Sequence, residues 1–133
     1  MEQMPESAPR RLAGLHAILL RHHKRLLESE RAAYERDVAR IASTGQYFNL
    51  AMNDPWFAWL RELSQFIVLV DEARAARNRP TEATAERLVG EARKLLTPDE
   101  AGRGFGRRYF EVLQRDPEAA LAHGDTMLAM GKV

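Results

Sequence analysis

The chain has 133 residues, 45% of them hydrophobic and 29% charged, which is the balance of an ordinary globular protein large enough to bury a core. Twenty Lys and Arg residues against nineteen Asp and Glu leave a formal net charge of +1, which argues against a dedicated nucleic-acid binder. The absence of cysteine excludes disulfides, thiolate metal sites and cysteine nucleophiles.

The N-terminal residues carry no apolar signal segment, and the longest apolar stretch, Phe66 to Val70, is far too short to span a bilayer. We therefore expect a cytoplasmic protein with a flexible tail over residues 1–9 and a single domain over residues 10–133. Helical periodicity dominates, and no stretch alternates long enough for a strand.

Helices are predicted, in chain order, over residues 10–42, 46–52, 55–77, 82–96, 98–115 and 117–130. Gly45 is a plausible C-cap of the first helix. Asp54-Pro55, Thr97-Pro98 and Asp116-Pro117 each combine an N-cap residue with proline at the first helical position. The predicted fold is all-α, an antiparallel helical bundle of four main helices plus short helices, with a long first helix.

A column of polar residues runs along the expected inner face of the first helix. His16, His23, Glu30 and Asp37 are spaced seven apart, so they lie on nearly the same side of a helix between mostly apolar columns. A polar side chain that faces a core must be hydrogen-bonded, paired or liganded. The column is therefore a structural network, a small-ligand or proton-linked site, or a metal site.

Several residues elsewhere are candidate partners of this column. His23 and Glu30 are about 10 Å apart along the helix, too far to share one metal ion directly. We expect Asp71 or Arg74, from the second long helix, to bridge them, with Tyr109 and His123 as further candidates. The chain has no Glu-x-x-His pair of the kind that di-iron bundles use, so no metal or cofactor is predicted.

Two further segments have alternative interpretations. The aromatic residues of Asp54-Pro55-Trp56-Phe57-Ala58-Trp59 either pack in the core or leave an exposed edge, with Phe57 as the residue off the inward stripe. The glycines of residues 102–106 either allow close helix packing or a hinge, or they accompany an anion site built from Arg103, Arg107 and Arg108. Sequence alone leaves open whether the helix is continuous there.

The second long helix is apolar on more than one side, since Phe57, Val68 and Leu69 lie off its inward stripe. Exposed apolar area of this kind marks an interface. No nucleophile elbow or other catalytic set is visible. The leading interpretation is a non-enzymatic interaction module that associates with itself or with another protein. The alternative is a small-ligand-binding or catalytic bundle whose pocket is lined by the polar column.

The segments 23–35 and Asp54 to Arg61, followed by Arg108-Tyr109 and residues 113–117, resemble a family of small bacterial all-helical proteins of unknown function. The resemblance covers most of the chain after the tail, and Asp-Pro-Trp-Phe-Ala-Trp-Leu is its most specific block. It implies a bacterial, cytosolic, single-domain protein. It implies no activity, cofactor or site residue.

Overall fold

The computed structural model describes residues 7–133, and every regular element in that range is a helix. The elements are α1 (Ser7–Asp37), α2 (Thr44–Asn53), the 3-10 helix η1 (Pro55–Leu60), α3 (Arg61–Ala75), α4 (Glu82–Leu95), α5 (Phe105–Arg115) and α6 (Pro117–Met130). The all-helical fold class predicted from the sequence is confirmed for this range. Residues 7–9 form the first turn of α1, and the rest of the expected tail lies outside the described residues.

The buried face of α1 organises the domain. Its buried side chains follow alternating steps of four and three residues, the pattern of a helix with one continuous packing seam. They are Ala8, Leu12, Leu15, Leu19, His22, Leu26, Ser29 and Ala33, with Glu30 beside them. Two polar residues, His22 and Ser29, therefore occupy seam positions.

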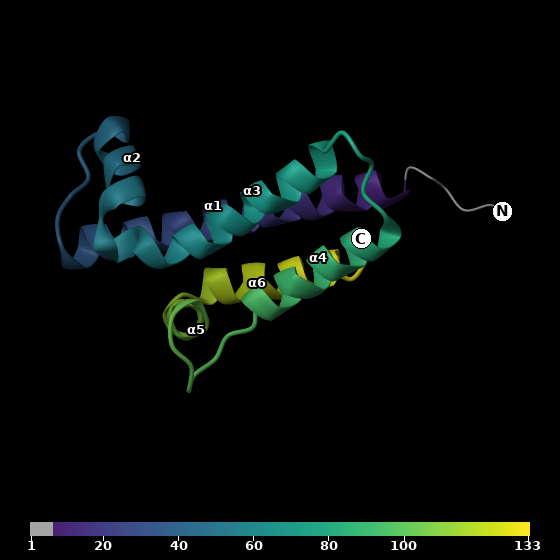
Figure 1. Ribbon diagram of the computed structural model, residues 1–133. Helices are drawn as coiled ribbons and strands as arrows, with labels where there is room; N and C mark the ends of the chain where they lie inside the picture. Colours follow the sequence, from purple (N-terminus) through teal and green to yellow (C-terminus); the bar gives the residue numbers. More distant parts are fainter. Residues whose placement is uncertain (1–6) are drawn as a thin grey trace.

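The most extensive contacts of α1 are with α3, α6 and α4, and η1 and α5 also pack against it. Figure 1 shows α1 and α3 running side by side, α4 and α6 along the other side of α1, and α5 seen nearly end-on at one end. At the opposite end, the Arg11 guanidinium donates a hydrogen bond to the carbonyl oxygen of Val133 (3.1 Å) and pairs with Glu82 and Glu86 of α4. The C-terminal residue is thus tied to the beginning of α1.

The first long helix ends five residues earlier than predicted. After Asp37 the chain turns so that Ile41 becomes buried, and the Glu35 carboxylate accepts the Ile41 amide (3.1 Å). Ser43 then caps α2 by accepting the Gln46 amide, so that Gly45 lies inside α2 rather than at the end of α1. The prediction of Gly45 as a C-cap was wrong.

The segment predicted as one helix over residues 55–77 divides into η1 and α3. Asp54 caps η1 as expected, accepting the Trp56 amide at 2.8 Å. In a 3-10 helix, residues three apart are eclipsed. Trp56 and Trp59 therefore project on the same side, toward α1.

The glycine segment is not helical throughout. The helix predicted over residues 98–115 begins only at Phe105, and residues 97–104 form turns held by the Asp99 amide bonding to the Gly106 carbonyl. Gly104 has a φ of 71° and is the only residue with positive φ in the described range. Residues that have a side chain rarely adopt this backbone conformation. Glycine at position 104 therefore allows the chain to turn just before α5 begins.

No helix in the described part of the chain is long and apolar enough to cross a membrane.

Candidate functional site

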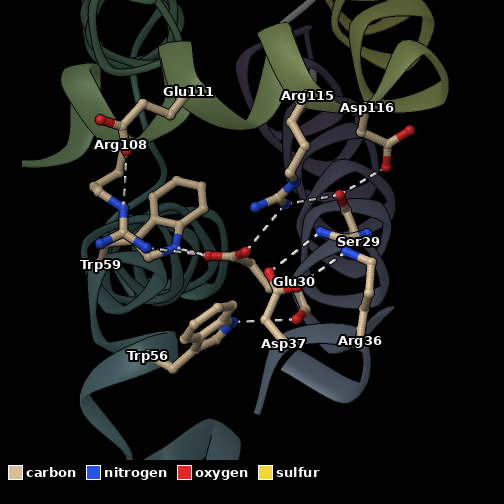
Figure 2. A network of polar contacts seen from close by, with 10 residues as sticks. All are labelled: Ser29, Glu30, Arg36, Asp37, Trp56, Trp59, Arg108, Glu111, Arg115 and Asp116. Carbon is tan, nitrogen blue, oxygen red and sulfur yellow. Dashed lines mark hydrogen bonds and ion pairs between the residues drawn. The ribbon is translucent and has the colours of Figure 1, made fainter. Parts of the chain in front are cut away.

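Glu30 is the centre of a buried polar network between α1, η1 and α5 (Figure 2). Its side chain has no exposed surface. One carboxylate oxygen accepts the indole N–H of Trp59 at 2.5 Å, and the other accepts a guanidinium N–H of Arg115 at 3.1 Å. The backbone carbonyl of Glu30 accepts the indole N–H of Trp56 at 3.2 Å.

Two arginines from α5 supply the positive charge of this network. Arg115 and Arg108 lie 3.1 Å and 3.6 Å from Glu30, and their side chains stay 33% and 43% exposed. Arg108 also lies 3.6 Å from Glu111. The anionic partner is thus fully buried, while both cations keep contact with water. This arrangement reduces the cost of desolvating the ion pairs.

The neighbouring residue on α1, Ser29, ties the same corner to α6. Its hydroxyl donates to the Asp116 carboxylate at 2.7 Å and accepts from Arg115 at 3.3 Å. Asp116 also caps α6 by accepting the Glu118 amide at 3.0 Å. Burial raises the pKa of Asp116, but the hydrogen bonds from Ser29 and from backbone amides outweigh it and hold that pKa below its usual range.

A second buried series of hydrogen bonds joins α1, α5 and α6. Nε2 of His22 lies 2.7 Å from the Tyr109 hydroxyl, and that hydroxyl lies 2.6 Å from Nδ1 of His123. Burial lowers the pKa of His22 to about 4 and raises that of Tyr109. Burial also lowers the pKa of His123. The imidazoles and the phenol are therefore neutral at pH 7.

The direction of these hydrogen bonds follows from one unpaired atom. Nδ1 of His22 is buried without a hydrogen-bond partner. An unpaired buried N–H is rarer than an unpaired lone pair, so we assign the His22 proton to Nε2, which donates to Tyr109. The Tyr109 hydroxyl then donates to Nδ1 of His123. All three groups are thereby held in one orientation.

The predicted polar column does not act as one unit. His23 is partly buried and bonds the Ser64 hydroxyl of α3 (2.9 Å), and burial lowers its pKa. His16 lies 3.8 Å from Asp71. Asp37, at the end of α1, has a side chain that is 52% exposed and pairs with Arg36. Only Glu30, of the four, is fully buried.

The expected bridge between His23 and Glu30 was wrong. Asp71 and Arg74 pair with each other on α3, and Asp71 faces His16 near the beginning of α1. The reason is the antiparallel course of α3, which places its C-terminal end beside His16 and leaves Glu30 to η1 and α5. The cations that pair with Glu30 are Arg108 and Arg115 rather than Arg74.

The structure does not bring Arg103, Arg107 and Arg108 together around one empty position. Arg107 pairs with Glu111 (3.0 Å), and Arg108 pairs with Glu30 and Glu111. Arg103 lines a groove between α3 and α4 instead. The first amides of α5 have no side-chain cap.

The aromatic segment packs inward. Phe57, the expected candidate for an exposed edge, is 1% exposed and packs between the rings of Tyr34 and Tyr47. Trp56 and Trp59 are partly buried, with their indole N–H groups on Glu30. The sequence pattern misplaced Phe57 because it assumed a regular α-helix through residues 55–60.

Sequence reasoning missed His22, Ser29 and Arg115. The signal for the first two was present, since alternating steps of four and three along α1 place both on the leucine seam. Arg115 had no comparable signal, because it is the last residue of a helix and meets Glu30 only in the folded chain.

The chemistry available to these groups is restricted. Both carboxylate oxygens of Glu30 are occupied, and the Tyr109 hydroxyl is held between two imidazoles. Within residues 7–133, no group of three or more His, Asp or Glu side chains is placed to hold a metal ion. These contacts therefore hold α5 and α6 on α1.

No family model, curated protein or solved structure matches the chain.

Proposed function

We propose that this protein is a non-enzymatic interaction module, an antiparallel bundle of four main helices plus short ones that associates with copies of itself in a bacterial cytoplasm. The main support for the proposal is the exposure of large apolar side chains at the surface, whereas the buried polar groups at Glu30 are bonded to one another. Eight such side chains are 45–70% exposed, namely Leu20, Val38, Phe48, Met52, Val68, Leu69, Leu121 and Leu128.

Four of these eight residues form two pairs with helical spacing. Phe48 and Met52 are four apart on α2, and Leu121 and Leu128 are seven apart on α6. Pairs of this kind form faces rather than scattered single residues. Contiguous apolar faces on a small domain are typical of protein–protein contacts.

The polar network supports an architectural role for the buried charges. Glu30 is enclosed by Trp59 and Arg115, so the space beside it is filled by protein. A pocket lined by the polar column would require open volume at Glu30. Filled packing favours the interaction module over a ligand site at this position.

Sedimentation equilibrium between about 1 and 200 µM tests the proposal. We expect the mean mass to rise with concentration from the 15.1 kDa of one chain toward twice that value. A constant monomer mass over the whole range would contradict self-association. Arg87→Gln, at an exposed position on α4 outside α2, α3 and α6, serves as a control and is expected to leave the mass curve unchanged.

A second candidate function, small-ligand binding, is favoured by a different feature. A groove of about 770 Å³ lies between α3, α4 and the turn before α5. Phe66, Leu69 and Phe105 supply apolar lining, and Lys94 and Arg103 supply positive charge. Its volume lies in the range of roughly 300–1,000 Å³ that is usual for small-molecule sites.

Fluorescence of an anilinonaphthalene sulfonate probe tests this second candidate, since the probe joins an apolar ring system to an anion. We expect saturable binding that weakens in Leu69→Glu and in Arg103→Glu. Leu128→Glu, on α6 and outside the groove, is the control. Equal loss of fluorescence in all three variants would mean that the probe binds exposed apolar surface generally, and the groove would not be the site.

A further inference from the structure

The outer face of α6 carries two strongly exposed apolar side chains. Leu121 and Leu128 are each 70% exposed, the highest value among the large hydrophobic side chains described. They are seven residues apart and so lie on the same side of α6. Gly124 lies between them in the sequence, and a Cβ added there would meet no heavy atom within 4 Å. No other part of residues 7–133 covers this face at Gly124.

The charged residues beside this face are not used in the ion pairs found among residues 7–133. Glu118 and Asp125 lie on α6, Lys132 follows it, and Arg21 and Arg25 of α1 line a small hollow with Asp125. None of the salt bridges between described residues includes any of the five. An apolar line flanked by such charges is similar to a protein–protein interface, which has an apolar centre and a polar rim.

The order of these residues along α6 is complementary to itself. When two copies of a helix meet antiparallel about a twofold axis, residues equally far from the axis on either side face each other. With the axis midway between Gly124 and Asp125, Leu121 of one copy faces Leu128 of the other. Glu118 and Lys132 are within one residue of being equally far from that axis, close enough for their long side chains to meet across the contact. Each apolar and each charged pair then forms twice.

We propose that α6 is the self-association surface of this chain and that its partner is a second copy packed antiparallel on Leu121, Gly124 and Leu128. The proposal rests on the self-association proposed above. Glu118 pairs with the partner's Lys132 at both ends of the contact. The two Asp125 carboxylates lie on the same flank near the axis, where Arg21 and Arg25 of α1 offset their repulsion.

The absence of cysteine provides a direct test of this geometry. In the proposed dimer the two Gly124 Cα atoms lie next to each other at the axis, within the roughly 4.4–6.8 Å that a disulfide spans. We expect Gly124→Cys to form a disulfide-linked dimer rapidly under mild oxidation. Ala83→Cys, an exposed position on α4, is the matched control and is expected to cross-link slowly.

Charge exchange at the ends of the contact is a second, independent test. Glu118→Lys and Lys132→Glu each place like charges opposite one another, and we expect each to raise the dimer dissociation constant by about tenfold. The double variant restores opposite charges and is expected to return to within about threefold of the native value. Circular dichroism of each variant verifies that the helices are retained.

The possible outcomes distinguish a failure of the α6 surface from a failure of self-association itself. A native chain that stays monomeric at 200 µM would overturn both proposals. A native dimer in which Gly124→Cys cross-links no faster than Ala83→Cys, and in which the double charge variant does not recover, would overturn the α6 surface alone. Rapid cross-linking together with recovery in the double variant would support both.

Discussion

Replacing Glu30 by alanine is the most direct test of the buried network. The change removes the acceptor of the Trp59 indole N–H and the counterion of Arg115 and Arg108. We expect Glu30→Ala to lower the free energy of unfolding, because a partly buried donor loses its partner and one methylene group leaves the core along with the carboxylate.

The magnitude follows from the exposure of each partner. An unsatisfied indole N–H costs about 1–3 kcal/mol, and the lost methylene costs about 0.8 kcal/mol. The arginine side chains are 33% and 43% exposed and can turn to water, so each pair contributes at most about 1 kcal/mol. Removing the Glu30 carboxylate also removes the cost of its desolvation, which offsets part of this loss. We expect a net loss of about 2–4 kcal/mol.

Urea unfolding monitored by tryptophan fluorescence measures this loss, with the m-value as a test of two-state behaviour. Glu30→Gln keeps the shape and the Trp59 acceptor and is expected to lose about half as much. Arg87→Ala removes an exposed pair with Glu91 on α4 and is the control, with a change below about 0.5 kcal/mol. A loss under about 0.5 kcal/mol for Glu30→Ala would refute the reasoning.

Three further predictions concern other buried or strained groups. Because burial lowers the pKa of His22 from 6.5 to about 4, the unfolded chain binds a proton that the folded chain does not, and stability falls as the pH falls from 6.5 toward 4. The contribution is about 2 kcal/mol between pH 6.5 and 5, and urea unfolding of His22→Gln at both pH values should show a correspondingly smaller drop. Tyr109→Phe leaves His22 and His123 without their shared hydroxyl and is expected to cost about 1–3 kcal/mol in the same assay at pH 7. Gly104→Ala is expected to cost about 1–3 kcal/mol because of the positive φ, whereas Gly90→Ala, inside α4 with open space at its Cβ, is expected to stabilise by about 0.5–1 kcal/mol; melting temperatures that shift in the same direction would contradict the assignment.

Local signals correctly predicted where η1, α4 and α6 begin. Asp54, Thr81 and Asp116 each accept an amide of the following turn, as their side chains and the prolines after two of them indicate. These interactions lie within three residues of sequence. The end of α1 was mispredicted because it depends on the burial of Ile41 and on the Glu35 carboxylate, and residues 38–42 contain nothing that breaks a helix.

The site was predictable only in part. The burial of Glu30 follows from the helical period, but the choice of its partners depends on how η1 and α5 meet α1. The seven-residue column drew attention to His16 and Asp37, which lie toward the edge or the end of the seam. The four-and-three spacing that includes His22 describes the buried face better.

The contacts of Ser29 and Glu30 with Asp116 and Arg115 also have a kinetic consequence. The contact between Ser29 and Asp116 joins residues 87 positions apart, and the contact between Glu30 and Arg115 joins residues 85 positions apart. A chain made from its N-terminus presents α1 long before α5 exists. Until then, the carboxylate and the hydroxyl compete with water, and the leucine seam around them stays open. The order of synthesis therefore delays closure of the α1 surface until the last part of the chain is available.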